Sequence, residues 1–152
     1  RRDPMANIPF VGYDMGTYLG HWLEMGRRIP RPPRIFLVNW FRKGEDGKFL
    51  WPGFGENMRA LQWILDRCDG RAGAKETPVG WTPRVSDLEL RELPAKPAAV
   101  EASLRVDIDE WRRELDLQQE WLDHLGPTVP RALRLQHDLL SEALETAKKV
   151  GG

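Results

Sequence analysis

Aromatic and basic residues gather in one stretch, which runs from Trp40-Phe41-Arg42-Lys43 to Lys48-Phe49-Leu50-Trp51-Pro52-Gly53-Phe54-Gly55-Glu56-Asn57. Phe41 and Phe54 belong to no periodic apolar stripe, unlike the aromatic residues of a core helix or strand. Aromatic faces beside Arg and Lys suit a nucleobase that carries phosphates, because stacking contributes about 1–3 kcal/mol per base. The stretch is therefore a candidate nucleotide site. The alternative is that its rings are ordinary core aromatics around a turn.

The residues next to Phe54 favour the same interpretation. Gly53 and Gly55 flank the ring and would let the backbone approach a flat ligand closely. Asn57 falls in the first turn of an expected helix, and its amide carries both a donor and an acceptor. Such an amide can distinguish guanine from adenine, because the two bases present different donors and acceptors.

The familiar catalytic signatures are absent from the sequence. It holds no G-x-x-x-x-G-K-[ST], and Gly53-Phe54-Gly55 starts a G-x-G-x-x-G pattern that fails at Met58. His21, His124 and His137 are scattered and lack the spacing of paired metal ligands. We therefore assign no catalytic residue and no metal ligand to this chain.

Length and composition indicate one soluble globular domain. The chain has 152 residues, of which 41% are hydrophobic and 30% charged. Its longest purely apolar run, Ile35 to Val38, is too short for a membrane span, and no signal peptide is visible. Cys68 is the only cysteine, so no internal disulfide forms and a cytoplasmic location is expected.

The charge is divided between the two halves of the sequence. Residues 1–75 carry 13 Lys and Arg against 8 Asp and Glu, whereas residues 76–152 carry 10 against 15. A basic first half is consistent with an anionic ligand, but also with two halves that attract each other or are simply solvated. A protein that binds duplex nucleic acid would usually be more basic overall.

The first half alternates helices with short strands. Apolar spacing predicts a helix from an Asp14 N-cap to Gly26. A strand buried on both faces is expected at Ile35–Trp40, and a second short strand at Phe49–Trp51. Between them, Gly44-Glu45-Asp46-Gly47 predicts a tight turn. A helix over 56–68 follows, with an apolar face made by Met58, Leu61, Leu65 and a buried Cys68.

The second half is more helical. An edge strand is possible over Thr77–Pro83, and a short helix around 97–105. Asp107 resembles the start of a capping box, and the helix it begins ends at Gly126-Pro127. Thr128 can cap a last helix whose apolar face is formed by Leu133, Leu140, Ala143, Leu144 and Ala147. The expected fold is α/β, with a few short strands packed with helices, and it ends in an α-helical hairpin.

The residues NWFRKGEDGKFLWPGFGEN, positions 39–57, closely resemble the guanine-binding segment of GTP-dependent phosphoenolpyruvate carboxykinases. DPMANIPFVGYDMGTYLGHW, positions 3–22, resembles the segment that follows that family's mobile active-site lid. ILDRCDG and TPVGWTP resemble what comes next, and the similarity weakens in the final helices. The sequence departs from the family at Asn7, where Met is usual, and at Asp14, where Asn is usual.

The resemblance implies roles for four residues. Phe41 and Phe54 would sandwich the guanine of GTP or GDP, Phe49 would pack at its side, and Asn57 would hydrogen-bond the base. It also implies that residues 1–152 form the C-terminal segment of the carboxykinase domain. Residues 1–83 would hold the base-binding part, and residues 107–150 the C-terminal helices.

The family converts oxaloacetate and GTP to phosphoenolpyruvate, CO2 and GDP, with Mn²⁺ and Mg²⁺ bound outside this segment. The resemblance therefore implies a monomeric, gluconeogenic parent enzyme, and an isolated chain without activity, because its P-loop, metal ligands and substrate arginines lie upstream. Two alternatives are a stand-alone module that binds a nucleotide or a single-stranded nucleic acid, and a purely structural helical piece.

Overall fold

The computed structural model describes residues 6–151 of the chain. They form two compact units. The first unit combines the residues up to Pro33 with those from Asp107 onward, and the second runs from Arg34 to Val106. In the described part of the chain, no helix combines the length and the apolar character needed to cross a membrane.

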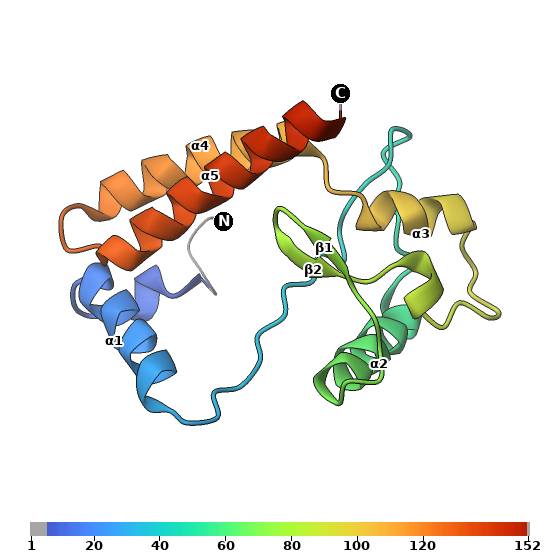
Figure 1. Cartoon of the computed structure of the whole chain (residues 1–152), viewed down its shortest axis with the longest axis horizontal. Helices are drawn as coiled ribbons and strands as arrows, with labels where there is room; N and C mark the ends of the chain where they lie inside the picture. Colours follow the sequence, from blue (N-terminus) through green and yellow to red (C-terminus); the bar gives the residue numbers. More distant parts are fainter. Residues whose placement is uncertain (1–5, 152) are drawn as a thin grey trace. The chain divides into compact units, whose positions relative to one another are not determined.

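Three helices build the first unit: α1 (Met15–Arg28), α4 (Ile108–Leu125) and α5 (Arg131–Gly151). Figure 1 shows α4 and α5 side by side as an antiparallel hairpin, with α1 beside the turn that joins them. The buried apolar residues of this unit are Met15, Leu115, Leu122, Val129 and Leu144. The expected helical hairpin and the apolar face of its last helix are thus confirmed.

Side-chain caps explain where two of these helices begin. The carboxylate of Asp14 accepts a hydrogen bond from the Thr17 backbone N–H at 2.8 Å, and Asp107 accepts one from Glu110 N–H at 2.9 Å. Each bond satisfies one of the amides that a helix N-terminus leaves without a partner. Gly126, with a φ of 84°, ends α4 as expected.

Two expectations about the ends of helices are wrong. α1 continues through Gly26 to Arg28, and Pro30 follows two residues later. Proline disfavours helical backbone in the residue before it, so it ends the helix more firmly than a glycine does. Thr128 donates its hydroxyl to Asp14 at 2.8 Å, and α5 starts three residues after Thr128.

The second unit contains α2 (Asn57–Cys68), α3 (Pro97–Leu104) and a two-stranded antiparallel sheet. β1 (Lys75–Thr77) pairs with β2 (Gly80–Thr82). The single edge strand expected over Thr77–Pro83 is therefore a hairpin instead, in which Thr77 ends β1 and only Gly80–Thr82 of the expected range form the second strand. The buried residues of the second unit are Trp51, Trp63 and Val100. The chain is therefore mixed α/β, as predicted.

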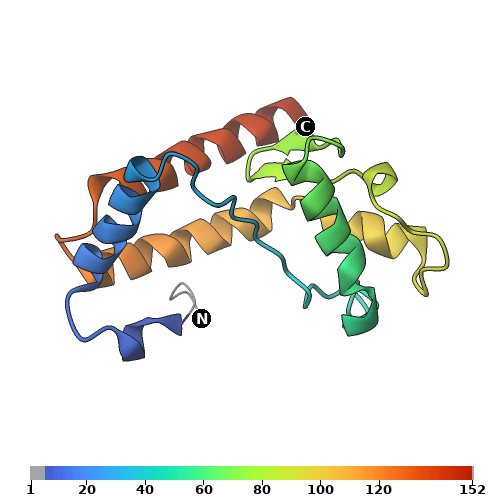
Figure 2. The same ribbon diagram turned by 90° about the horizontal axis from the view of Figure 1, so that it is seen from below.

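The expected strand at Ile35–Trp40 is absent: these residues are irregular backbone, and Figure 2 shows them as part of the loop that leads toward α2. Phe36 packs edge-on against Trp63, with ring centroids 6.1 Å apart. Ile35 and Leu37 are 92% and 93% exposed. The described chain offers this segment no partner strand, so its backbone amides form no ladder. The second expected strand is likewise reduced to one bridge at Phe49.

The apolar face expected on α2 is also not the buried one. Met58, Leu61 and Leu65 are exposed, and Cys68 is half-buried rather than buried. The buried residue of this helix is Trp63, whose indole N–H donates to the Gly73 carbonyl at 3.1 Å. Helical spacing predicted the helix correctly, but not which of its faces is covered in this part of the chain.

Candidate nucleotide site

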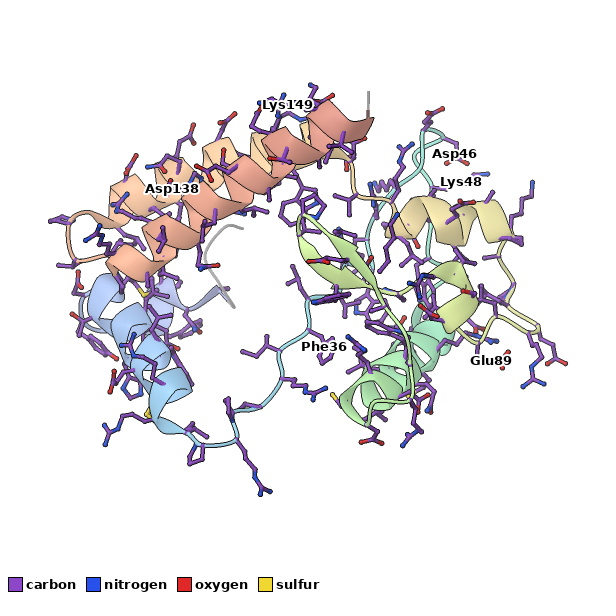
Figure 3. All side chains as sticks on the ribbon, viewed as in Figure 1. Phe36, Asp46, Lys48, Glu89, Asp138 and Lys149 are labelled. Carbon is purple, nitrogen blue, oxygen red and sulfur yellow. The ribbon has the colours of Figure 1, made fainter. Side chains whose placement is uncertain are left out.

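A tight turn brings the two halves of the aromatic stretch together. Lys43 and Phe49 face each other in an isolated antiparallel bridge, and Gly47 takes a positive φ of 74° in the turn between them. Asp46 and Lys48 lie at its tip (Figure 3), where the Asp46 carboxylate accepts a hydrogen bond from the Lys48 backbone N–H at 3.0 Å. The turn expected from the glycines is confirmed.

This turn brings Phe41 and Phe49 into contact. Their ring centroids lie 6.0 Å apart at an interplanar angle of 66°, an edge-to-face arrangement. The ammonium of Lys43 lies 5.4 Å from the centroid of the Phe49 ring. Phe41 is 72% exposed and Phe49 is 56% exposed, so a large part of both rings is open to a ligand.

Arg42 fastens this stretch to the end of α3. Its guanidinium donates to the Ser103 carbonyl at 3.3 Å and also to the carbonyl of Arg105. Sequence alone placed Arg42 among cations that could face a phosphate. In the structure the side chain instead orients the backbone between Phe41 and Lys43. No local sequence pattern predicts this, because the two partners lie more than sixty residues away.

Phe54 occupies the loop that leads into α2. Gly53 has a φ of 129° and a ψ of −172°, a conformation that side-chain-bearing residues rarely adopt. Phe54 then opens a single 3₁₀ turn, and its ring is 91% exposed. None of the aromatic ring pairs formed within residues 6–151 includes Phe54.

Asn57 is the first residue of α2, where the sequence placed it. Its Oδ1 accepts a hydrogen bond from the Trp51 indole N–H at 2.9 Å. Trp51 is only 9% exposed and lies 6.0 Å from the ring of Trp40. No role in the site follows for Trp51 from the sequence, although Trp51 stands inside the aromatic stretch at positions 39–57. The signal was a Trp six residues before a helix-start Asn, which is too general to predict this bond.

An ion pair holds the beginning of α2 in place. The Arg59 Nε lies 2.6 Å from a carboxylate oxygen of Glu56, and both side chains are mostly buried. A second nitrogen of Arg59 donates to the Glu89 carbonyl at 2.7 Å. The helix start that carries Asn57 is therefore anchored from two directions, and the Asn57 backbone has a fixed position.

Residues 6–151 do not fit a metal site. Among them, His, Cys, Asp and Glu side chains nowhere gather in a group of three or more. Mg²⁺ and Mn²⁺ take several oxygen or imidazole ligands, which this part of the chain does not bring together. The described residues thus offer aromatic faces and an oriented amide to a ligand.

Known proteins similar to this chain are carboxykinases named for GTP. Residues 1–143 match the family described as "Phosphoenolpyruvate carboxykinase C-terminal P-loop domain". The chain is 57% identical over 150 residues to the "Phosphoenolpyruvate carboxykinase [GTP]" of Anaeromyxobacter dehalogenans (strain 2CP-1 / ATCC BAA-258), covering 99% of this chain and 25% of the relative. A protein of the same name from Corynebacterium kroppenstedtii is 47% identical over 152 residues, covering 99% of this chain and 24% of that protein.

The chain thus spans about a quarter of the length of the curated relatives it matches. The family match covers nearly all of the sequence, and both relatives align along almost its full length. The chain belongs to the family of GTP-dependent phosphoenolpyruvate carboxykinases.

Proposed function

We propose that this chain supplies the guanine-binding part of an enzyme that converts oxaloacetate and GTP to phosphoenolpyruvate, CO2 and GDP. The observation that carries the proposal is the exposure of three phenylalanine rings in one short stretch that ends at Asn57. Phe41, Phe49 and Phe54 are 72%, 56% and 91% exposed. A stacking site has to present open faces to its ligand, and this stretch presents three of them close together in the sequence.

In this proposal the guanine lies between Phe41 and Phe54. Phe49 packs at the side of the base, supported by its edge contact with Phe41 and by the Lys43 ammonium above its ring. Gly53 and Gly55 let the backbone around Phe54 come close to the base plane. The match to carboxykinases named for GTP favours this arrangement over a module for single-stranded nucleic acid.

The remaining chemistry belongs to the longer protein. Mn²⁺ and Mg²⁺ would neutralise the phosphates and the developing charge there, on ligands outside this chain. Oxaloacetate and phosphoenolpyruvate would bind there as well. The isolated chain should therefore form no phosphoenolpyruvate. By family resemblance the parent enzyme is a monomer, and its cytoplasmic location is proposed from the single Cys68.

The proposal is tested by comparing GTP with ATP as substrates. The protein for this test is a full-length carboxykinase that contains this sequence. Guanine presents O6 as an acceptor where adenine presents an amino donor, so the wrong base leaves a polar group unpaired. Asn57→Ala should therefore lower the ratio of kcat/KM for GTP to that for ATP by about ten- to a hundredfold. An unchanged ratio would remove Asn57 from the site.

A further inference from the structure

We propose that Trp51 is a positioning residue that decides which end of the Asn57 amide faces the base. The proposal rests on the guanine site described above and adds a determinant of its specificity. The Trp51 indole N–H holds Oδ1 of Asn57, which leaves the Nδ2 amino group to donate to the guanine O6.

The chemistry of the indole fixes the direction of this bond. Trp51 Nε1 lies 2.9 Å from Asn57 Oδ1. An indole nitrogen is a donor only, so the amide atom next to it has to be the oxygen and not the amino group. The two ends of an amide point in different directions, and Nδ2 therefore keeps both of its hydrogens for another acceptor.

The surroundings of Trp51 make it a rigid support. Its ring is 9% exposed and packs 6.0 Å from that of Trp40. Asn57 is held by its place at the start of α2, where the Arg59–Glu56 ion pair fixes the backbone. A buried donor that lost its acceptor would be left unsatisfied, so this hydrogen bond resists a flip of the amide.

The same bond closes the loop that carries Phe54. Trp51 and Asn57 are six residues apart, and the chain between them passes through Gly53, with its φ of 129°. Phe54 has no aromatic neighbour within residues 6–151 to hold its ring. The closed loop therefore sets the place of Phe54 as well as the orientation of the amide.

Selectivity follows from the fixed orientation. With Nδ2 facing the base, Asn57 donates to the O6 of guanine or hypoxanthine and meets a second donor in the amino group of adenine. Without the indole, the amide can rotate and offer Oδ1 to that amino group. A variant that lacks the indole N–H should consequently accept ATP better relative to GTP, and should treat GTP and ITP alike because both carry O6.

The experiment compares kcat/KM for GTP, ITP and ATP in the full-length enzyme. Trp51→Phe keeps an aromatic ring but removes the N–H. Its matched control is Trp63→Phe, because Trp63 is buried in the same unit and also donates its indole N–H, to the Gly73 carbonyl. We expect Trp51→Phe to lower the GTP-to-ATP ratio by about tenfold with the GTP-to-ITP ratio unchanged. Trp63→Phe should leave both ratios at the wild-type values.

Asn57→Asp provides a test that does not alter Trp51. Its carboxylate still accepts from the indole but places an oxygen where the proposal puts the amino group, so the GTP-to-ATP ratio should fall. Retention of the wild-type ratio by Asn57→Asp would overturn the proposed orientation, even if Trp51→Phe did not fold.

The two proposals fail in different ways. If Asn57→Ala lowers the GTP-to-ATP ratio while Trp51→Phe matches Trp63→Phe, the positioning role is wrong and the guanine site stands. If Asn57→Ala also leaves the ratio unchanged, Asn57 takes no part in base choice and the positioning role is wrong with it. The guanine site itself is wrong only if Phe41→Ala and Phe54→Ala also leave GTP binding unchanged.

Discussion

The two units of this chain bury different kinds of residue. In the described chain, the unit with α1, α4 and α5 buries five apolar residues, all aliphatic or Met: Met15, Leu115, Leu122, Val129 and Leu144. The unit from Arg34 to Val106 buries Trp51, Trp63 and Val100, while the rings of its Phe41, Phe49 and Phe54 are exposed.

Under the proposed function, this difference separates the residues that stabilise the fold from the residues that recognise the base. The aliphatic residues and Met15 come from all three helices and from the connection between α4 and α5, so the helical unit has a core of its own. The second unit uses its two buried indoles to hold backbone and side chains in place, through the bonds from Trp51 to Asn57 and from Trp63 to Gly73. Its apolar rings remain free to meet a ligand.

The largest expected effect is the loss of a buried leucine in the helical unit. Leu144 is completely buried, whereas Leu139 on the same helix is 48% exposed. Leu144→Ala should lower the free energy of unfolding by about 2–5 kcal/mol, the usual cost of a cavity at a fully buried site. Leu139→Ala should cost clearly less. Denaturant unfolding of both variants measures the difference, and equal losses would argue against a distinct core in this unit.

Disturbing the close packing of α1 should lower the stability of the fold by a somewhat smaller amount. A Cβ atom at Gly16 would lie 2.4 Å from the backbone carbonyl carbon of Thr128, whereas one at Gly20 would lie 3.7 Å from Pro130. Gly16→Ala should destabilise the protein by about 1–3 kcal/mol because backbone has to move. Gly20→Ala should be neutral or stabilising by up to about 1 kcal/mol, since alanine favours helix. Thermal unfolding distinguishes them, and a neutral Gly16→Ala would refute the close approach.

The smallest effect concerns acid stability. The Thr17 backbone N–H, and then the Thr128 hydroxyl, hold the pKa of Asp14 below its usual value. A lowered pKa stabilises the fold above the ordinary carboxyl pKa of about 4, and this contribution is lost as the pH falls through the lowered value. Asp14→Asn still offers an amide oxygen but does not titrate, so its stability should fall less on acidification. Identical pH dependence of unfolding in both proteins would contradict this role.

Local signals in the sequence predicted much of the helical unit. Asp14, Asp107 and Gly126 mark helix ends through bonds and backbone angles that involve only nearby residues. Thr128 was expected to cap α5, but it bonds to Asp14 instead. The sequence does not reveal this partner, because the two residues are 114 positions apart. Helix caps formed by residues close together in the sequence can be predicted from the sequence. Contacts between residues far apart in the sequence cannot.

The second unit was harder to predict for a physical reason. The run at Ile35–Trp40 has the composition of a buried strand, but a strand needs a partner and the described chain provides none. Met58, Leu61 and Leu65 share a helix face that remains exposed here for the same lack of a covering element. The motif nevertheless placed Asn57 at the start of α2 and a turn between Phe41 and Phe49.

The central claim is that the exposed rings of the second unit serve the nucleotide and the buried residues of the first serve stability. The most direct measurement is the GTP dissociation constant and the melting temperature of full-length Phe41→Ala, Phe54→Ala and Leu144→Ala. We predict that each phenylalanine variant loses about 1–3 kcal/mol of GTP binding and melts like the wild type. Leu144→Ala should melt at a lower temperature and bind GTP normally. If Phe41→Ala and Phe54→Ala only lowered the melting temperature, their rings would be core residues and the claim would be wrong.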